Sequence, residues 1–139
     1  MSKQFRVAVV GATGAVGEVM LAVLAERKFP ISEIHALASE RSAGGYVAFG
    51  NDEVMVRDLA TFDPTGIDIA LFSAGGSISR EYAPKFAAAG AVVIDNSSVF
   101  RGDADVPLVV SEVYLFYFCN RPRGIFAIFF CFFNDSVSP

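Results

Sequence analysis

The sequence predicts an α/β fold built on a doubly wound parallel sheet, and three observations support this prediction. Short apolar runs alternate with segments whose apolar residues have helical spacing, as in repeated strand–helix units. The run Val7–Val10 is continuously apolar, which is typical of a parallel strand buried on both faces. A glycine-rich turn follows this run directly and opens a helix.

Length and composition indicate one domain with a real core. Of the 139 residues, 53% are hydrophobic and 19% are charged, so disorder is not expected. A net charge of -4 favours small-molecule partners, with no nucleic acid and no membrane. Residues Met1–Gln4 lead into the first strand without a signal peptide pattern, so a cytoplasmic location is expected. Cys119 and Cys131 have neither metal-ligand nor disulfide spacing, and no metal site is predicted.

The stretch Phe5–Gly17, FRVAVVGATGAVG, carries the strongest functional signal. Gly11 would permit the sharp turn, Gly14 would let the backbone approach a pyrophosphate, and Gly17 would let the helix pack closely on the sheet. The free amides of Thr13–Val16 would bind phosphates at the positive end of the helix. The spacing G-x-x-G-x-x-G is a variant of the dinucleotide fingerprint. Its strand–turn–helix context favours a Rossmann-like dinucleotide site over a purely structural turn.

The remaining elements follow from the same patterns. In chain order we predict a helix over Ala15–Lys28, a strand over Ile34–Ala38, two short strands within Tyr46–Leu59, a connector over Thr61–Gly66, a strand over Ile67–Ala74, a helix from Ser77 to Gly90 and a strand over Ala91–Asp95. Ser77 is predicted to cap the second helix, and Pro84 lies inside it at a point where a helix can kink.

Polar residues after the second predicted strand are candidates for contact with the adenosine ribose. A carboxylate at this place suits the 2′-hydroxyl of NAD, whereas an arginine with hydroxyl neighbours suits the 2′-phosphate of NADP. The segment Ser39–Gly45 contains Glu40, which favours the first, and Arg41 between Ser39 and Ser42, which we take as an NADP clamp. The alternative is a solvated polar turn.

Glycines also follow the third predicted strand, Ile67–Ala74. Ligands bind at the carboxyl ends of strands in open α/β sheets. We therefore expect Gly75 and Gly76, together with Ser73, to admit the nicotinamide half of the cofactor.

Five segments, GATGAVG, ASERSAGG, FSAGG, IDNSSVFR and VPLVVSEV, resemble the aspartate-semialdehyde dehydrogenase family over roughly residues 4–113. The Asn-Ser-Ser-x-Phe-Arg run is similar to these enzymes and not to the related acetylglutamyl-phosphate reductases. The resemblance implies an NADPH-dependent, phosphorylating aldehyde dehydrogenase that interconverts β-aspartyl phosphate and aspartate semialdehyde through a cysteine. Its small-molecule substrate and inorganic phosphate would be partners, in a homo-oligomeric enzyme of lysine, threonine and methionine biosynthesis.

The resemblance also implies roles for individual residues. The pyrophosphate would be held by Gly11, Thr13, Gly14, Ala15 and Val16. Arg101 would bind the phosphoryl group of the substrate, because a guanidinium offers a bidentate fork to phosphate. Asn96, Ser97 and Ser98 would line the same cleft. The alternatives are a surface ion pair for Arg101 and a hydrogen-bonded turn that touches no ligand for Asn96–Ser98.

The tail departs from this pattern. Seven of the 14 phenylalanines lie in the last 26 residues, so we expect a dinucleotide-binding domain over 1–113 and an aromatic-rich tail over 114–139 that forms no independent domain. Cys131 takes the position of the family's catalytic cysteine, but flanking phenylalanines would disfavour its thiolate by desolvation. The alternative is a buried apolar cysteine. Asn120–Arg123 divide the tail into pieces too short to span a membrane, and Ile125–Phe133 is prone to aggregation.

The resemblance further implies a fold truncated before the family's second domain, which supplies the catalytic histidine and most of the dimer interface. His35, within a predicted strand, is expected to be structural. We therefore expect the chain alone to be inactive, with a tail that arose from a frameshift or a corrupted reading of the gene. A non-catalytic NADP-binding module is the alternative function, and a chain that does not fold stably is a third possibility.

Overall fold

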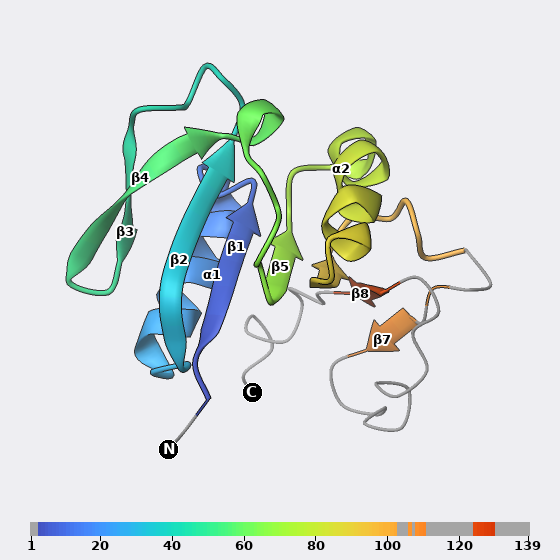
Figure 1. Ribbon diagram of the computed structural model, residues 1–139, viewed down its shortest axis with the longest axis horizontal. Coiled ribbons are helices and arrows are strands. Elements are labelled where there is room, and N and C mark those ends of the chain that lie inside the picture. Colours follow the sequence, from blue (N-terminus) through green and yellow to red (C-terminus); the bar gives the residue numbers. More distant parts are fainter. Residues whose placement is uncertain (1–2, 103–105, 107, 111–123, 130–139) are drawn as a thin grey trace, which may run out of the picture.

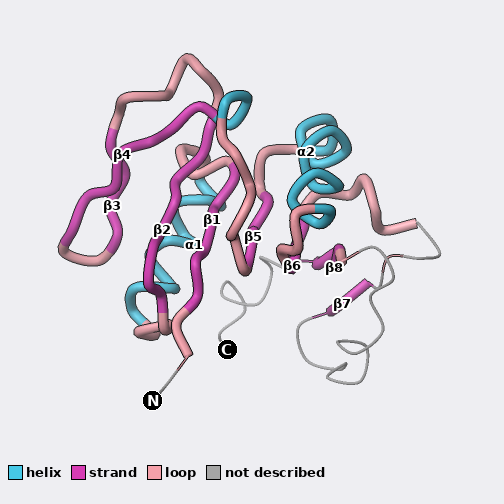
Figure 2. The backbone as a smooth tube through the Cα atoms, in the orientation of Figure 1, coloured by secondary structure: helices cyan, strands magenta, loops and turns pink. Residues whose placement is uncertain are grey.

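The computed structural model describes residues 3–102, 106, 108–110 and 124–129 and has a sheet with a helix on each face (Figure 1). Its elements are β1 (Phe5–Val10), α1 (Ala15–Glu26), β2 (Ile31–Ala38), β3 (Tyr46–Phe49), β4 (Asp52–Asp58), the short 3₁₀ helix η1 (Leu59–Thr61), β5 (Ile69–Phe72), α2 (Gly76–Ala88), β6 (Val92–Asp95), β7 (Leu108–Val110) and β8 (Ile125–Phe129). Strands and helices alternate along most of this path (Figure 2).

The strand order places a topological switch beside β1. In the described part of the chain, eight strands form the sheet in the order β3-β4-β2-β1-β5-β6-β8-β7. β3 and β4 are antiparallel, and every other neighbouring pair is parallel. After β1 the chain adds β2 and β4 on one side, and then returns to add β5 and β6 on the other. This order confirms the predicted doubly wound, Rossmann-like sheet, and open sheets of this type bind ligands at the switch.

Alternate residues of β1 face two separate cores. Val9 packs on the side that includes Leu21 of α1, whereas Ala8 and Val10 pack on the side that includes Phe86 of α2. All five side chains are buried. The two helices therefore cover opposite faces of the sheet (Figure 1). Because β1 is buried on both faces, its sequence is a continuous apolar run.

Several element bounds differ from the prediction. β2 begins at Ile31, earlier than the predicted start at Ile34. Ser32 and Glu33 are exposed and so fall outside the apolar pattern, but the backbone of this stretch already pairs with β1. β5 covers only residues 69–72, although Ile67 is also buried. The prediction that Ser77 caps the second helix is wrong: α2 begins at Gly76, its cap residue is Gly75, and no side chain caps it. Glycine at this corner leaves the first amides of α2 without a side-chain acceptor.

Part of the predicted tail belongs to the sheet. β8 lies between β6 and β7, and Val93 N donates to Gly124 O across 2.9 Å at its start. Ile125, Phe126 and Ala127 are buried, so neighbouring strands and α2 cover this portion of the segment expected to aggregate. Cys119 and Cys131 lie outside the described residues. Within the residues described, no helix is long and apolar enough to cross a membrane.

Candidate dinucleotide-binding site

The corner between β1 and α1 is fixed by contacts between backbone atoms. Gly11 has a φ of 86°, and a Cβ built on it would lie 2.8 Å from the carbonyl carbon of Ser73. A Cβ on Gly17 would overlap the carbonyl oxygen of Gly11. A Cβ on Gly14, by contrast, would make an ordinary contact of 3.5 Å with the same oxygen. The fold therefore requires glycine at 11 and 17, but not at 14.

Gly14 is also the cap residue of α1, and no side chain caps this helix. The first amides of an α-helix have no partner inside the helix, and they carry the positive end of its dipole. The amide of Gly14 itself is turned inward, donating to Gly11 O across 3.1 Å. An anion can therefore approach the start of α1 without displacing a capping side chain, and the absent Cβ of Gly14 leaves room for it.

A cleft of about 540 Å³ opens beside this corner, at the switch between β1 and β5. It is lined by Val10, Gly11, Thr13, Gly14, Ala38, Ser39, Glu40, Asp58, Leu59, Ala60, Ser73, Ala74, Ile78 and Tyr82. Of the predicted cofactor residues, Gly11, Thr13, Gly14, Ser39 and Ser73 lie on its wall. The others, Ala15, Val16, Arg41, Ser42, Gly75 and Gly76, do not line it.

Sequence reasoning missed one wall of the cleft, which η1 and α2 form. Leu59 and Ala60 come from η1, which begins after Asp58 because the Asp58 carboxyl accepts a hydrogen bond of 3.0 Å from Ala60 N. Ile78 and Tyr82 come from α2 and are four residues apart, so they share one helix face. Asp58, two residues before Ala60, is a capping signal for η1, but the sequence pattern predicts strand up to Leu59.

The predicted clamp residues lie in one tight turn after β2. Ser42 N donates to Ser39 O across 2.9 Å, and Ala43 N donates to the same oxygen across 3.1 Å. Glu40 lines the cleft, whereas Arg41 is exposed and lies beyond its wall. The turn thus places the Glu40 residue on the cleft wall and its neighbour Arg41 outside that wall.

The predicted phosphate residues follow β6. Asn96 N donates to Phe72 O across 2.9 Å, which ties this loop to the end of β5. Arg101 Nη2 donates to Asn96 O across 2.9 Å, so the two residues lie together, as a shared site requires. The Arg101 side chain is partly buried. Neither residue lines the cleft described above.

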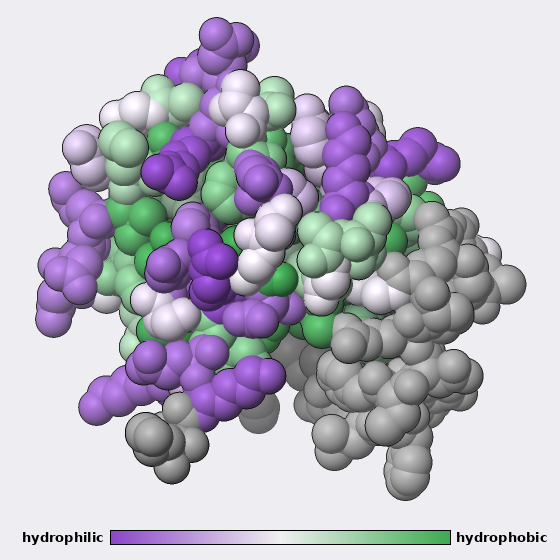
Figure 3. Space-filling view, viewed as in Figure 1, coloured by the Kyte–Doolittle hydropathy of each residue, from purple (hydrophilic) through white to green (hydrophobic). Residues whose placement is uncertain are grey.

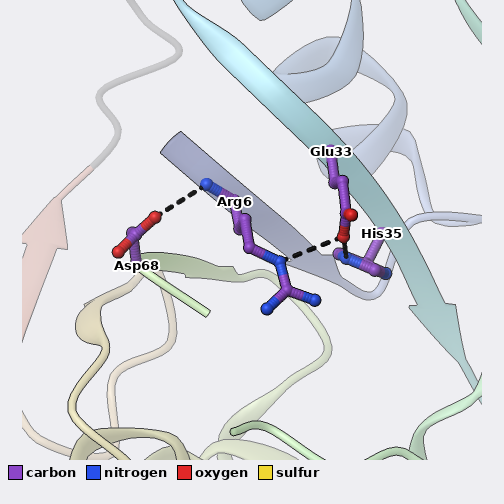
Figure 4. Close-up of polar contacts among 4 residues, drawn as sticks. All are labelled: Arg6, Glu33, His35 and Asp68. Atoms are coloured by element: carbon purple, nitrogen blue, oxygen red, sulfur yellow. Dashed lines mark hydrogen bonds and ion pairs between the residues drawn. The ribbon is translucent and has the colours of Figure 1, made fainter. Parts of the chain in front are cut away.

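His35 belongs to another polar group, on β1 and β2. Glu33 Oε2 accepts from Arg6 Nε across 3.0 Å and is 3.2 Å from His35 Nε2, while Arg6 N donates to Asp68 Oδ2 (Figure 4). Burial lowers the pKa of His35, although the hydrogen bond to Glu33 opposes this shift. Hydrophilic residues gather over these two strands (Figure 3), beside a hollow of about 480 Å³ that His35 and Arg6 line. His35 does not line the dinucleotide cleft.

The glycine corner, the uncapped start of α1 and a cleft at the strand switch together define a dinucleotide-binding domain of the Rossmann type. Comparison with known families gives the particular group: the semialdehyde dehydrogenase NAD-binding domain matches residues 6–116. The chain belongs to this family.

Individual relatives agree with this assignment. The aspartate-semialdehyde dehydrogenase of Legionella pneumophila is 59% identical over 110 residues, which is 79% of this chain and 32% of that protein. Aspartate-semialdehyde dehydrogenase 2 of Vibrio cholerae is 58% identical over 113 residues, covering 81% of this chain and 34% of the relative. A crystal structure of the Vibrio cholerae enzyme II complexed with ASA superposes with a TM-score of 0.87 at 53% identity, over 91% of this chain and 42% of that one. The chain therefore spans about a third of the length of the curated relatives it matches.

Proposed function

We propose that this chain is the NADP-binding part of an aspartate-semialdehyde dehydrogenase. The enzyme would interconvert aspartate semialdehyde and β-aspartyl phosphate, a step toward lysine, threonine and methionine. The observation that carries this proposal is the cleft at the β1/β5 switch, where Gly14 leaves the start of α1 open although the fold tolerates a side chain there.

The residues present fit a dinucleotide. Amides of Thr13, Ala15 and Val16 would bind the pyrophosphate at the start of α1. Ser73 lines the cleft on the β5 side, and Gly75 and Gly76 continue from it, so this side would hold the nicotinamide half. When bound, NADPH would supply the hydride for reduction.

The clamp for the 2′-phosphate would be the turn after β2. Arg41 is exposed, which leaves its guanidinium free to reach a phosphate at the mouth of the cleft, and Ser39 and Ser42 are held beside it by the turn. Glu40 lies at the same end and would repel that phosphate. We place Arg41 as the dominant charge, since a guanidinium can form two hydrogen bonds to one phosphate.

Substrate chemistry would take place on the side of the 96–101 loop. Arg101 and Asn96 would bind the phosphoryl group, because the guanidinium is held beside the loop by its bond to Asn96 O. Cys131, by its position in the resemblance, would be acylated by the substrate with release of phosphate. Since the match covers about a third of the relatives' length, we propose that turnover also involves the part of the enzyme outside this match, within a homo-oligomeric enzyme.

Replacing Gly14 by Ala tests the pyrophosphate assignment. The added Cβ makes only an ordinary contact inside the protein, so the melting midpoint should change little, while NADPH should bind about tenfold or more weakly because the methyl group occupies its approach. Gly102→Ala is the matched control, because a Cβ there meets no atom within 4 Å in the part of the chain that the structure describes. Fluorescence titration with NADPH and thermal melts give both quantities. Equal affinity in both variants would contradict the assignment.

Cofactor choice is tested by Arg41→Ala with Glu40→Ala as its control. Arg41→Ala should weaken NADPH by about tenfold and leave NADH unchanged, because only NADPH carries the 2′-phosphate. Glu40→Ala should not weaken NADPH. If wild type binds both cofactors equally, or if Arg41→Ala weakens both alike, the clamp assignment fails.

A non-catalytic NADP-binding module is the second candidate, because the cleft and the uncapped start of α1 account for dinucleotide binding without any catalytic group. Incubation with aspartate semialdehyde, phosphate and NADP separates the two functions when the remaining two thirds of a relative, such as the Vibrio cholerae enzyme, are supplied as a second polypeptide. Reduced cofactor should accumulate only if the chain is the nucleotide-binding part of the enzyme, and Cys131→Ala should then abolish the signal. NADPH binding without turnover in this mixture would favour the module.

A further inference from the structure

Asp95, the last residue of β6, has no exposed surface and no assigned role. Its Oδ1 accepts from Ser79 Oγ across 2.6 Å and from Ser97 N across 3.1 Å, and its Oδ2 accepts from Ser97 Oγ across 2.6 Å. Among the described residues, Asp95 and Ser79 are the buried polar side chains of the core. A buried carboxyl group is costly unless donors surround it, and here both oxygens are used.

The three hydrogen bonds join two separate elements. Ser79 lies in the first turns of α2, at the corner that no side chain caps. Ser97 lies in the 96–101 loop, which holds Arg101 through Asn96 O. Asp95 is therefore the side chain that links the start of α2 to the loop that carries the proposed phosphate site.

A local turn alone does not need this arrangement. Asp63 and Thr65 make the same pattern in solvent: Asp63 Oδ1 accepts from Thr65 N across 3.0 Å and from Thr65 Oγ1 across 2.7 Å. That exposed turn has no third partner from another element among the described contacts. The burial of Asp95 and its bond to Ser79 therefore serve more than the turn after β6.

We propose that Asp95 is a positioning residue that fixes the 96–101 loop, and with it Arg101, against the start of α2, so that a phosphate-bearing substrate meets a preset guanidinium. This inference rests on the proposed function, since it assumes that Arg101 binds phosphate. Asp95 does not contact the ligand itself, because its side chain is buried. Ser79 is equally buried, so an effect of its removal on phosphate binding must pass through Asp95.

The test uses the full chain, with inorganic phosphate and NADPH as separate probes, well below the lowest melting midpoint. Asp95→Ala should weaken phosphate by about tenfold or more, whereas Asp95→Asn, which keeps an acceptor for Ser79, should weaken it by about threefold. Ser79→Ala should weaken phosphate by about threefold, and NADPH affinity should change by less than about threefold in all variants. Thr65→Ala, the matched control in the exposed turn, should change neither.

A nitrogen-15 spectrum of the arginine side chains supplies a readout that does not depend on affinity. The Arg101 Nε–H signal, assigned by its loss in Arg101→Lys, should shift in Asp95→Ala and Ser79→Ala and stay in place in Thr65→Ala. If both variants lower the melting midpoint while this signal and the phosphate affinity remain those of wild type, Asp95 is only structural and the inference is overturned. Wild type that binds NADPH but no phosphate also overturns it, whereas wild type that binds no NADPH contradicts the proposed function itself.

Discussion

Two strand-to-helix corners face the same edge of the sheet, and they are held in different ways. Both contain a glycine at positive φ, 86° at Gly11 directly after β1 and 94° at Gly75 directly before α2, and neither helix has a side-chain cap. At the β1–α1 corner, a Cβ on Gly11 or Gly17 would collide with backbone atoms. At the β5–α2 corner, a Cβ on Gly75 would meet no atom of the described residues within 4 Å, and Asp95 supplies a link between α2 and the 96–101 loop. The first corner depends on glycines packed against backbone, whereas the second is joined to Val10 O by Ser73 and has, in addition, a buried carboxyl group that holds its helix.

Gly17→Ala should have the largest effect on stability. Its Cβ would overlap the backbone of Gly11, which cannot move away as a flexible side chain can, so we expect a loss of about 3 kcal/mol or more. Urea unfolding followed by circular dichroism measures this loss. A midpoint close to that of wild type would mean that the first corner can relax, and the contrast between the corners would disappear.

Ser79→Ala should cause the second largest loss of stability, because it removes the hydrogen bond from Ser79 of α2 to Asp95. Removing one partner of a buried hydrogen bond costs about 1–3 kcal/mol. The same unfolding experiment measures this loss, with Ser77→Ala as a control, since Ser77 lies in the same turn and its side chain does not cap the helix. Equal midpoints for both variants would show that Asp95 does not secure the second corner.

Gly75→Ala should cost less than Gly17→Ala, because only backbone strain opposes it. A non-glycine residue in the left-handed region costs about 1–2 kcal/mol, and no steric overlap adds to it here. Urea unfolding of Gly75→Ala and Gly17→Ala in one series compares the two losses of unfolding free energy directly. A loss at Gly75 as large as at Gly17 would contradict the distinction between a packed and an open corner.

The smallest effect should come from pH, through a group outside both corners. Because burial lowers the pKa of His35 in the folded protein, protonation disfavours the fold. The contribution of neutral His35 to the free energy of unfolding is fully present above the usual histidine pKa of about 6.5. It is lost as the pH falls through the lower pKa that His35 has in the folded protein. Thermal melts between about pH 7 and 5 should show this slope in wild type and a shallower one in His35→Gln. An identical slope in both would contradict it.

The first corner could be predicted because its determinants lie within one short stretch. A buried strand, three glycines at fixed spacing and an apolar helix specify the corner locally, and the Gly11 turn is found as expected. The second corner could not be predicted in this way. Asp95 was visible only as the polar end of a strand, and its partner Ser79 is 16 residues away on α2. A contact of this kind depends on how the helix packs on the sheet, which spacing alone does not give.

The same distinction applies to the cleft. The cleft residues Gly11, Gly14 and Ser39 could be predicted, because they come directly after predicted strands. Leu59 and Tyr82 could not, because they belong to η1 and α2, whose placement depends on tertiary packing. β8 was also unexpected, because an aromatic-rich run gives no sign of which strand it will pair with.

The position of β8 sets an order of assembly during synthesis. β7 pairs only with β8 among the described strands, although β8 follows it in the chain. As the polypeptide leaves the ribosome, β1 to β6 can associate first, while residues 108–110 must wait for residues 125–129 to emerge. The nascent domain therefore completes this end of its sheet late, and a ribosome that pauses between those two strands would hold β6 with an unpaired edge.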